Sequence, residues 1–204
     1  MSVLELGPLG LSSHPDWREG LPIMVTRRVM MRELRRADAP ELMRLATTPE
    51  IVEHTWPAPA DVQAFERFIE WTRSRRAAGN YTCFAVVPKG HHAPAGLFEL
   101  RSLQPGFFRA ELSFFIEQAF WGTGVFHDAA RLVCDFAFKA VGVHRIEARA
   151  EVDNGRANGA LRKLGAVNEG RLRAAFVRHG EPVDQFLWSL VNGVDTIPPA
   201  PTAG

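Results

Sequence analysis

Two glycines, placed between an extended segment and an amphipathic helix, most constrain how this chain folds. Residues 109–117 have the aromatic and β-branched content of a strand, and residues 125–141 carry apolar side chains at helical spacing. Trp121-Gly122-Thr123-Gly124 stands between them. Residues 145–152 again have the composition of a strand. The sequence therefore predicts a strand, a helix and a parallel or near-parallel strand, joined by a right-handed crossover.

The glycine turn is suited to binding an anion. Without side chains, Gly122 and Gly124 let a ligand approach the backbone, and the first amides of a helix point outward at the positive end of its dipole. A tight turn also uses glycines for structural reasons alone, and this alternative stays open here. No Gly-Lys-Ser/Thr follows and the three-glycine dinucleotide pattern is absent, so nucleoside triphosphate chemistry is disfavoured.

Other segments predict a layered body of helices and strands. Asp38 and Asp61 are expected to cap two helices before the main sheet. Further strands are predicted at residues 81–87, 95–103, 169–177 and 183–191, and a further helix at residues 156–164. The last two strands flank His179-Gly180 and indicate a terminal hairpin.

Length and composition indicate one domain. The 204 residues, 46% of them hydrophobic, suffice for one core, and we expect an irregular extension at residues 1–22, one domain at residues 23–194 and a Pro-rich tail at residues 195–204. The 24 basic and 23 acidic side chains nearly cancel, which argues against a nucleic-acid partner. Cys83 and Cys134 have no CxxC or nearby histidine, so we expect neither a disulfide nor a metal site. No leader and no run of about 20 apolar residues is present, which favours a cytoplasmic protein without a membrane partner.

Several short motifs recur in a characteristic order. They lie at residues 110–116, 120–124, 137–138, 144–148, 153–154, 161–165 and 169–170, with Asp184 in the last hairpin. On these motifs, from about Arg27 to Val191, the chain resembles the RimJ/RimL-type branch of the GNAT superfamily of acyl-CoA N-acyltransferases.

The resemblance implies a fold, a cofactor and a set of binding residues. The fold is mixed α/β (α+β), with helices flanking a central, mostly antiparallel sheet that splays between its fourth and fifth strands, residues 109–117 and 145–152. Acetyl-CoA would place its pantetheine arm in this opening. Its thioester carbonyl would accept hydrogen bonds from amides near Phe115 and Ile116. Its pyrophosphate would lie on the amides of Gly122, Thr123, Gly124, Val125, Phe126 and His127.

Some positions depart from the family pattern. Ala119 replaces an Arg or Gln, Phe126, His127 and Asp128 replace small, Thr or Glu residues, and Ala166-Val167 replaces a Phe. Ala157 stands where this branch often has a Ser that assists at the thioester sulfur. The only tyrosine, Tyr81, lies on an early strand rather than in the terminal region. No general acid is therefore evident, although a thiol with a pKa of about 8.5 is a tolerable leaving group.

Glu111 is the preferred candidate for the catalytic base. A carboxylate on the splayed strand could take a proton from an incoming ammonium, directly or through water. The alternative is an exposed or salt-bridged glutamate, and Glu99 on the neighbouring strand is the rival for the role and a candidate for substrate binding.

Three further positions have two interpretations each. Asn154 either caps the following helix or, as the resemblance implies, binds pantetheine. Trp56, in a rigid Trp-Pro-Ala-Pro loop, either contacts the acceptor or packs in the fold. His91-His92 is expected to lie in a solvated turn.

Two functions remain in competition. The first is an N-acetyltransferase that moves an acetyl group from acetyl-CoA to a primary amine, on a protein amino terminus or a small molecule, by direct attack in a ternary complex. The second is a CoA-binding regulatory module with weak or no transferase activity, which Ala157 and the missing terminal tyrosine support. An amine acceptor is the expected partner, and a homodimer is a candidate assembly.

Overall fold

The computed structural model describes residues 3–4, 16–54, 59–178 and 180–193. Within them, nine strands form one sheet in the order β1-β2-β3-β4-β5-β6-β7-β9-β8. Their bounds are β1 Val3–Leu4, β2 Ile23–Val25, β3 Val29–Glu33, β4 Tyr81–Pro88, β5 Gly96–Ser102, β6 Arg109–Ile116, β7 Arg145–Glu151, β8 Val167–Arg178 and β9 Glu181–Val191. Only β1–β2 and β6–β7 pair in parallel among these described strands, so the sheet is mixed and mostly antiparallel, as predicted.

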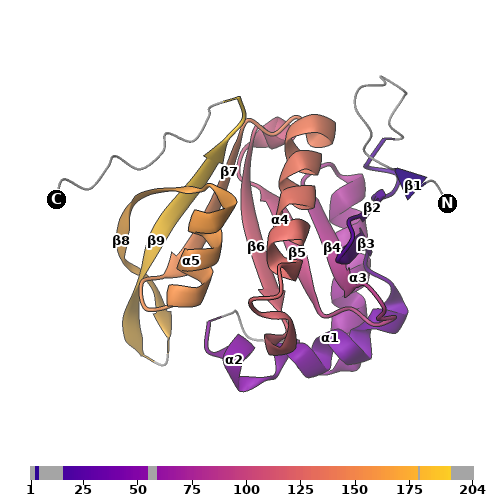
Figure 1. Ribbon diagram of the computed structural model, residues 1–204, viewed down its shortest axis with the longest axis horizontal. Helices are drawn as coiled ribbons and strands as arrows, with labels where there is room; N and C mark the ends of the chain where they lie inside the picture. The colour runs from indigo at the N-terminus through magenta and orange to yellow at the C-terminus, as the bar shows by residue number, and fades with distance from the viewer. Residues whose placement is uncertain (1–2, 5–15, 55–58, 179, 194–204) are drawn as a thin grey trace.

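Helices cover both faces of this sheet (Figure 1). The α-helices are α1 Ala39–Ala46, α2 Pro49–Val52, α3 Val62–Ala77, α4 Val125–Phe136 and α5 Gly155–Leu164; Ala137–Val141 continues α4 as a π-helix, and short 3-10 helices span Arg36–Asp38, Pro105–Phe107 and Gln118–Phe120. Figure 1 shows α4 and α5 on the near face and α1 and α3 on the far face. None of the helices in the described ranges is long and apolar enough to cross a membrane.

The side chains of β4 show how the two faces are filled. Phe84 and Val86 belong to the core cluster under α4, whereas Cys83 and Ala85 belong to the cluster under α1 and α3. All eight residues of β4 are buried, as expected for a central strand covered on both faces. The sheet therefore separates two apolar layers.

The predicted strand, helix and parallel strand are present, since β6 and β7 pair in parallel and α4 lies between them in the chain. The helix predicted at residues 125–141 is present, and it ends at Gly142, whose φ of 84° is left-handed. Asp61 caps α3, since its Oδ1 accepts a hydrogen bond from Ala64 N at 2.6 Å. The terminal hairpin is formed by β8 and β9.

Asp38 does not cap α1 as predicted. It stands at the N-cap position, but its side chain makes no capping hydrogen bond. Its two oxygens instead accept hydrogen bonds from Arg32 Nη1 and Nη2, at 2.7 and 2.8 Å, and one also accepts from Arg35 N at 2.7 Å. Both side chains of the Arg32–Asp38 pair are under 10% exposed. A buried guanidinium must be paired, and this requirement prevails over capping.

The amino-terminal segment, predicted to be irregular, contains ordered parts. Val3–Leu4 pairs with β2, and Trp17 is buried in the main core, where its ring contacts Phe107 edge-on at 5.7 Å. The predicted tail at residues 195–204 lies outside the described residues.

Candidate active site

The sheet opens between β6 and β7. The two strands pair in parallel only from Arg109↔Arg145 to Glu111↔Glu147. Beyond that point β6 stays paired with β5 as far as Ile116, and β7 stays paired with β9 as far as Glu151. Each strand is thus held on its outer side while the two part from each other, which confirms the predicted splay between residues 109–117 and 145–152.

A cavity of about 1170 Å³ occupies this opening. It is lined by both strands, by the turn before α4, by the start of α5 and by one face of α3. Phe114 packs in the core layer under α4, whereas its neighbour Phe115 packs in the layer under α1 and α3. Because both line the cavity, it connects the two faces of the sheet.

The predicted glycine turn lies at the α4 side of this cavity. Gly122 and Gly124 have φ values of 77° and 89°, in the left-handed region that favours glycine. Gly124 is the N-cap of α4 and offers no side-chain oxygen to the first helical amides, although Thr123 Oγ1 accepts a long hydrogen bond from Val125 N at 3.4 Å; such a helix start is suited to an anion. Trp121 Nε1 donates to Ile116 O at 2.8 Å and fixes the turn against the end of β6.

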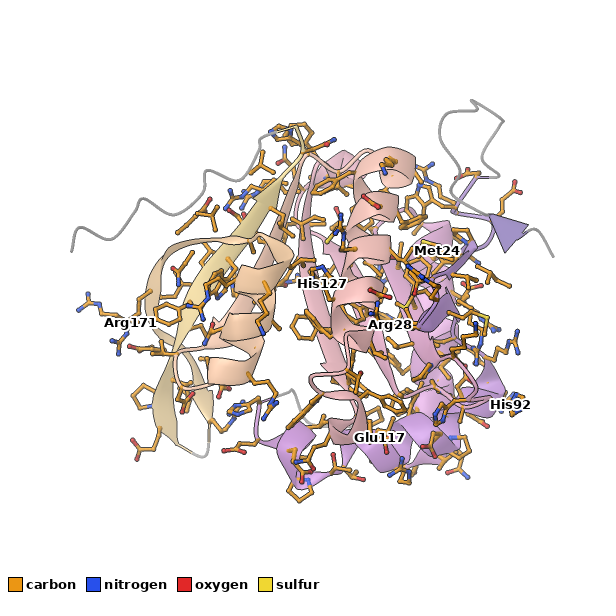
Figure 2. The ribbon with its side chains drawn as sticks, viewed as in Figure 1. Met24, Arg28, His92, Glu117, His127 and Arg171 are labelled. Carbon is orange, nitrogen blue, oxygen red and sulfur yellow. The ribbon has the colours of Figure 1, made fainter. Side chains whose placement is uncertain are left out.

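Arg28 and Arg156 add positive charge at the turn, and neither was predicted. The Arg156 guanidinium lies 4.1 Å from the centroid of the Trp121 ring, and Arg156 lines the cavity. Arg28, labelled beside α4 in Figure 2, contacts Asp128 at 3.3 Å, and a Cβ at Gly124 would come within 3.2 Å of its Nε. Asp128 also accepts a hydrogen bond from Thr26 at 3.0 Å, so this departure from the family pattern anchors the β2–β3 turn to α4.

The predicted cofactor residues are brought together only in part at the cavity wall. Its described lining includes Phe115, Ile116, Gly122, Phe126 and Asn154. Thr123, Gly124, Val125 and His127 form the adjoining turn and first turn of α4, outside that lining.

Asn154 caps α5, one of its two predicted roles. Its Oδ1 accepts a hydrogen bond from Ala157 N at 2.9 Å. Asn154 and Ala157 also line the cavity, next to the turn. Contact with pantetheine stays a prediction, and Ala157 brings no hydroxyl to this wall.

Acidic side chains gather on the opposite, α3 side of the cavity. Glu111 is nearly buried, with its side chain 13% exposed, and its two oxygens pair with Arg101 and Arg149, the latter at 3.4 Å. The salt-bridged alternative for Glu111 is therefore what the structure shows, while its role as a base stays a prediction.

Glu99 has a different environment from Glu111. It lines the cavity and accepts a hydrogen bond from the Tyr81 hydroxyl. Burial raises the pKa of Glu99, and burial, together with nearby Cys83 and Glu99, raises the pKa of Tyr81. Phe65, Phe68 and Trp71 of α3 form an aromatic wall on the same side.

His54 and Glu151 form a third polar group in the cavity that was not predicted. His54 Nδ1 lies 2.8 Å from Glu151 Oε2. The other oxygen of Glu151 pairs with Arg178 at the end of β8, which also binds the carbonyl of Glu53. Figure 1 shows α2, which precedes His54, between the lower end of the β8–β9 hairpin and the rest of the sheet. Trp56, the predicted acceptor contact, lies outside the described residues.

This group has the residue types of a metal site, but its buried carboxylate is already engaged. One ligand atom each from His54, Glu151 and Asp153 lies within 4.8 Å of the others. One oxygen of Glu151 pairs with Arg178 and the other with His54 Nδ1, so neither oxygen is free to bind a metal ion.

Only some of the unpredicted residues had a usable signal in the sequence. Glu151 alternates with Glu147 and Arg149 on a predicted strand, which places it on their face of the sheet. His54 and Arg156 reach the cavity through tertiary packing, which no local pattern reveals.

The comparisons with known proteins agree with this geometry. A family model described as an acetyltransferase (GNAT) domain matches residues 28–167. An uncharacterised N-acetyltransferase of Bacillus licheniformis, p20, is 24% identical over 170 residues, covering 83% of this chain and 96% of the relative.

Two solved structures show the same fold. The ribosomal-protein-S5-alanine acetyltransferase of Vibrio fischeri has a TM-score of 0.74 at 20% identity, covering 86% of this chain and 99% of its own. Mycobacterium smegmatis RimJ in complex with CoA-disulfide has a TM-score of 0.73 at 21% identity, covering 80% and 82%. With the family model matching well over half of its residues, and with the splayed sheet and glycine turn in place, this chain belongs to the GNAT family of acetyltransferases.

Proposed function

We propose that this protein is an N-acetyltransferase that moves an acetyl group from acetyl-CoA to a primary amine by direct attack in a ternary complex. The observation that carries the proposal is one cavity joining the glycine turn on one face of the sheet to the acidic wall on the other. Two substrates that enter from opposite faces would meet between β6 and β7. Such an arrangement holds the reacting atoms together without a covalent enzyme intermediate.

The residues at the turn fit the phosphate end of acetyl-CoA. Gly122 and Gly124 leave the backbone open to a phosphate, and Arg28 and Arg156 supply compensating charge. When bound, acetyl-CoA supplies an activated thioester. On this reading the amides of Phe115 and Ile116 polarise its carbonyl, and Asn154 binds the pantetheine arm.

The acceptor side suits a cationic amine. Glu99, Glu111 and Glu151 bring carboxylate oxygens to the cavity, and the aromatic wall of α3 suits an ammonium or an apolar group beside it. Glu99 is our candidate for binding the acceptor. The two solved structures named above are described as ribosomal-protein acetyltransferase and RimJ, so a protein amino terminus is one acceptor class to test, beside small-molecule amines.

We also place the protein in the cytoplasm. Both cysteines, Cys83 and Cys134, are free and buried, as suits a reducing compartment. A homodimer is the assembly to test, by light scattering across a range of protein concentrations.

Thermal unfolding with acetyl-CoA, CoA and longer acyl-CoAs tests the cofactor. At a free ligand concentration of 100 times the Kd, binding at one site stabilises the folded protein by about 2.7 kcal/mol. This raises Tm by about 5 to 10 °C in a chain of this size. Gly124→Ala is the matched variant, because it places a side chain at a left-handed φ beside Arg28, and it should weaken the shift. If no CoA compound raises Tm, both the transferase and the CoA-binding module are excluded.

Release of free CoA then separates the two functions. The probes are phenethylamine, spermidine and hexapeptides that begin with Ala or Ser, each with acetyl-CoA and a thiol reagent. Acceptor-dependent release supports the transferase. Stabilisation by acetyl-CoA with no release from any of these amines favours the regulatory module.

A further inference from the structure

We propose that His54, oriented by Glu151, is the group that takes the proton from the acceptor amine. The inference rests on the proposed transferase function and names a residue outside the sheet as its base. His54 follows α2, whereas Glu151 ends β7, so tertiary contact alone brings them together.

The hydrogen bond between them fixes the form of the imidazole. Arg178 pairs with one oxygen of Glu151, and His54 Nδ1 lies 2.8 Å from the other. An ionised carboxylate only accepts hydrogen bonds, so Nδ1 carries the proton. In a neutral imidazole this leaves the lone pair on Nε2, the form that a general base requires.

The two side chains of the pair differ in exposure, as expected for a base and the residue that positions it. The Glu151 side chain is 5% exposed, whereas that of His54 is 25% exposed. The carboxylate is thus held inside and bonded on both oxygens, and the imidazole is the member open to a ligand. Both residues line the cavity.

The pair also lies at the level where the thioester is expected. Phe115 and Glu151 each stand four residues beyond the last paired positions of β6 and β7, Glu111 and Glu147. Counted along the two strands, Glu151 is therefore level with Phe115, whose amide is the predicted partner of the thioester carbonyl. A base held by Glu151 would therefore face the predicted thioester site across the opening between β6 and β7.

The two glutamates considered for the role are less suited to it. Both oxygens of Glu111 already pair with guanidinium groups, which compete with a proton for the same lone pairs. Glu99 stands on β5, one strand farther from the opening than β6, and its carboxylate already accepts a hydrogen bond from the Tyr81 hydroxyl.

Acetylation removes two protons from the acceptor nitrogen. Nε2 of His54 takes one proton from the ammonium, and Glu151 stabilises the imidazolium. The freed amine nitrogen attacks the thioester carbon, the C–N bond forms, the C–S bond breaks and sulfur leaves with the electron pair. The nitrogen loses its second proton through water to the thiolate, which gives CoA, and the imidazolium returns its proton to solvent.

Kinetics of His54→Ala with phenethylamine, or with whichever probe amine the wild type acetylates, provide the first test. A lost general base lowers kcat by about 100-fold or more, at unchanged acetyl-CoA affinity, and added imidazole should restore part of it. His92→Ala is the matched control, because His92 lies exposed in a turn at the outer edge of the molecule (Figure 2) and should keep wild-type kcat. Wild-type kcat in His54→Ala, or a loss that imidazole does not restore, overturns the proposal.

Glu151→Gln tests the positioning role through the pH profile. Glu151 and Asp153 face His54, Arg178 pairs with Glu151, and Glu50 and Glu53 line the same cavity. Gln keeps the size of the side chain but removes the charge that stabilises the imidazolium, so the acidic limb of kcat/KM should move to lower pH. If Glu151 were purely structural, Glu151→Gln would lower the stability of the protein without moving the acidic limb of kcat/KM. This result would contradict the positioning role of Glu151.

Nitrogen NMR of the histidine ring tests the inference without turnover. Comparison of the wild type with His54→Gln assigns the His54 signals, and we expect the neutral ring to carry its proton on Nδ1 and a lone pair on Nε2. A neutral ring with its proton on Nε2 overturns the inference even in an inactive protein. Failure of the proposed function is distinct, since it appears as no CoA release from wild type with any probe amine.

Discussion

Two neighbouring guanidinium groups decide whether the Glu111 carboxylate can act as a catalytic base. Glu111→Gln separates two roles for it. Loss of a base lowers kcat by about 100-fold or more, whereas loss of one acidic group of the cavity wall raises the amine KM several-fold and spares kcat. We expect the second result, because Arg101 and Arg149 occupy both oxygens. Steady-state kinetics at saturating acetyl-CoA distinguish the two.

The control for Glu111 is another glutamate changed in the same way. Glu181→Gln, at the exposed start of β9, should leave both kcat and the amine KM at wild-type values. A fall in kcat confined to Glu111→Gln would restore Glu111 as the base and count against His54.

At the scale of elements, the Asn154 cap joins the end of β7 to α5. Asn154→Ala removes the oxygen that binds Ala157 N and should lower the free energy of unfolding by about 1 kcal/mol. Asn154→Asp keeps a capping oxygen and is the matched control. Urea unfolding measures both variants. Equal stability in Asn154→Ala and wild type would mean that the cap contributes nothing to the fold.

The ion pair between β7 and β8 gives a pH-dependent contribution to stability. Hydrogen bonds from Arg145 and Ser189 hold the pKa of Glu169 at about 2, below its ordinary value of 4.5. A lowered folded-state pKa stabilises the fold above the unfolded value, and this contribution is lost as the pH falls from about 4.5 towards 2. It is small, about 0.5 to 1 kcal/mol, because the Glu169 side chain is 37% exposed.

Glu169→Gln isolates this contribution. The variant should be less stable than wild type at pH 7, and the difference should shrink below pH 4.5, as measured by urea unfolding at each pH. A difference that stays constant from pH 7 to pH 2 would assign the effect to packing rather than charge.

The helices whose periodicity, caps and stop signals lie close together in the sequence could be predicted from it. The period of residues 125–141 and the stop at Gly142 fix α4 and its extension, and Asp61 has a capping partner three residues on. Asp38 fails as a cap because a distant requirement, the buried Arg32 guanidinium, takes its carboxylate. Local patterns describe groups whose partners are near in sequence, and they miss those whose partners are not.

The candidate site divides in the same way. The glycine turn is continuous in sequence and was predicted with its neighbours, whereas the acceptor side is assembled from α2, α3, β5, β6, β7 and β8. His54 meets Glu151 across 97 positions of the chain. Such a contact depends on the position of α2 against the sheet, which the residues of α2 do not specify.

At the scale of the whole molecule, the parallel β6–β7 pair organises the site. A sheet closed along its full length would separate the glycine turn from the acidic wall. Because pairing between the two strands ends at Glu111 and Glu147, while β5 and β9 hold their outer sides, the opening is built into the framework. The opening therefore depends on the stability of the sheet, which holds both of its sides.

The amino-terminal segment contributes to that stability through Trp17. The ring is 6% exposed, lies in the main core cluster and packs edge-on against Phe107. Trp17→Ala should cost about 3 to 5 kcal/mol, or about 6 to 20 °C in Tm, because it leaves a cavity in the core. Trp71→Ala is the control, since Trp71 is 43% exposed and should cost less. Thermal and urea unfolding of both variants test this. If Trp17→Ala lowers the free energy of unfolding no more than Trp71→Ala does, Trp17 does not stabilise the domain.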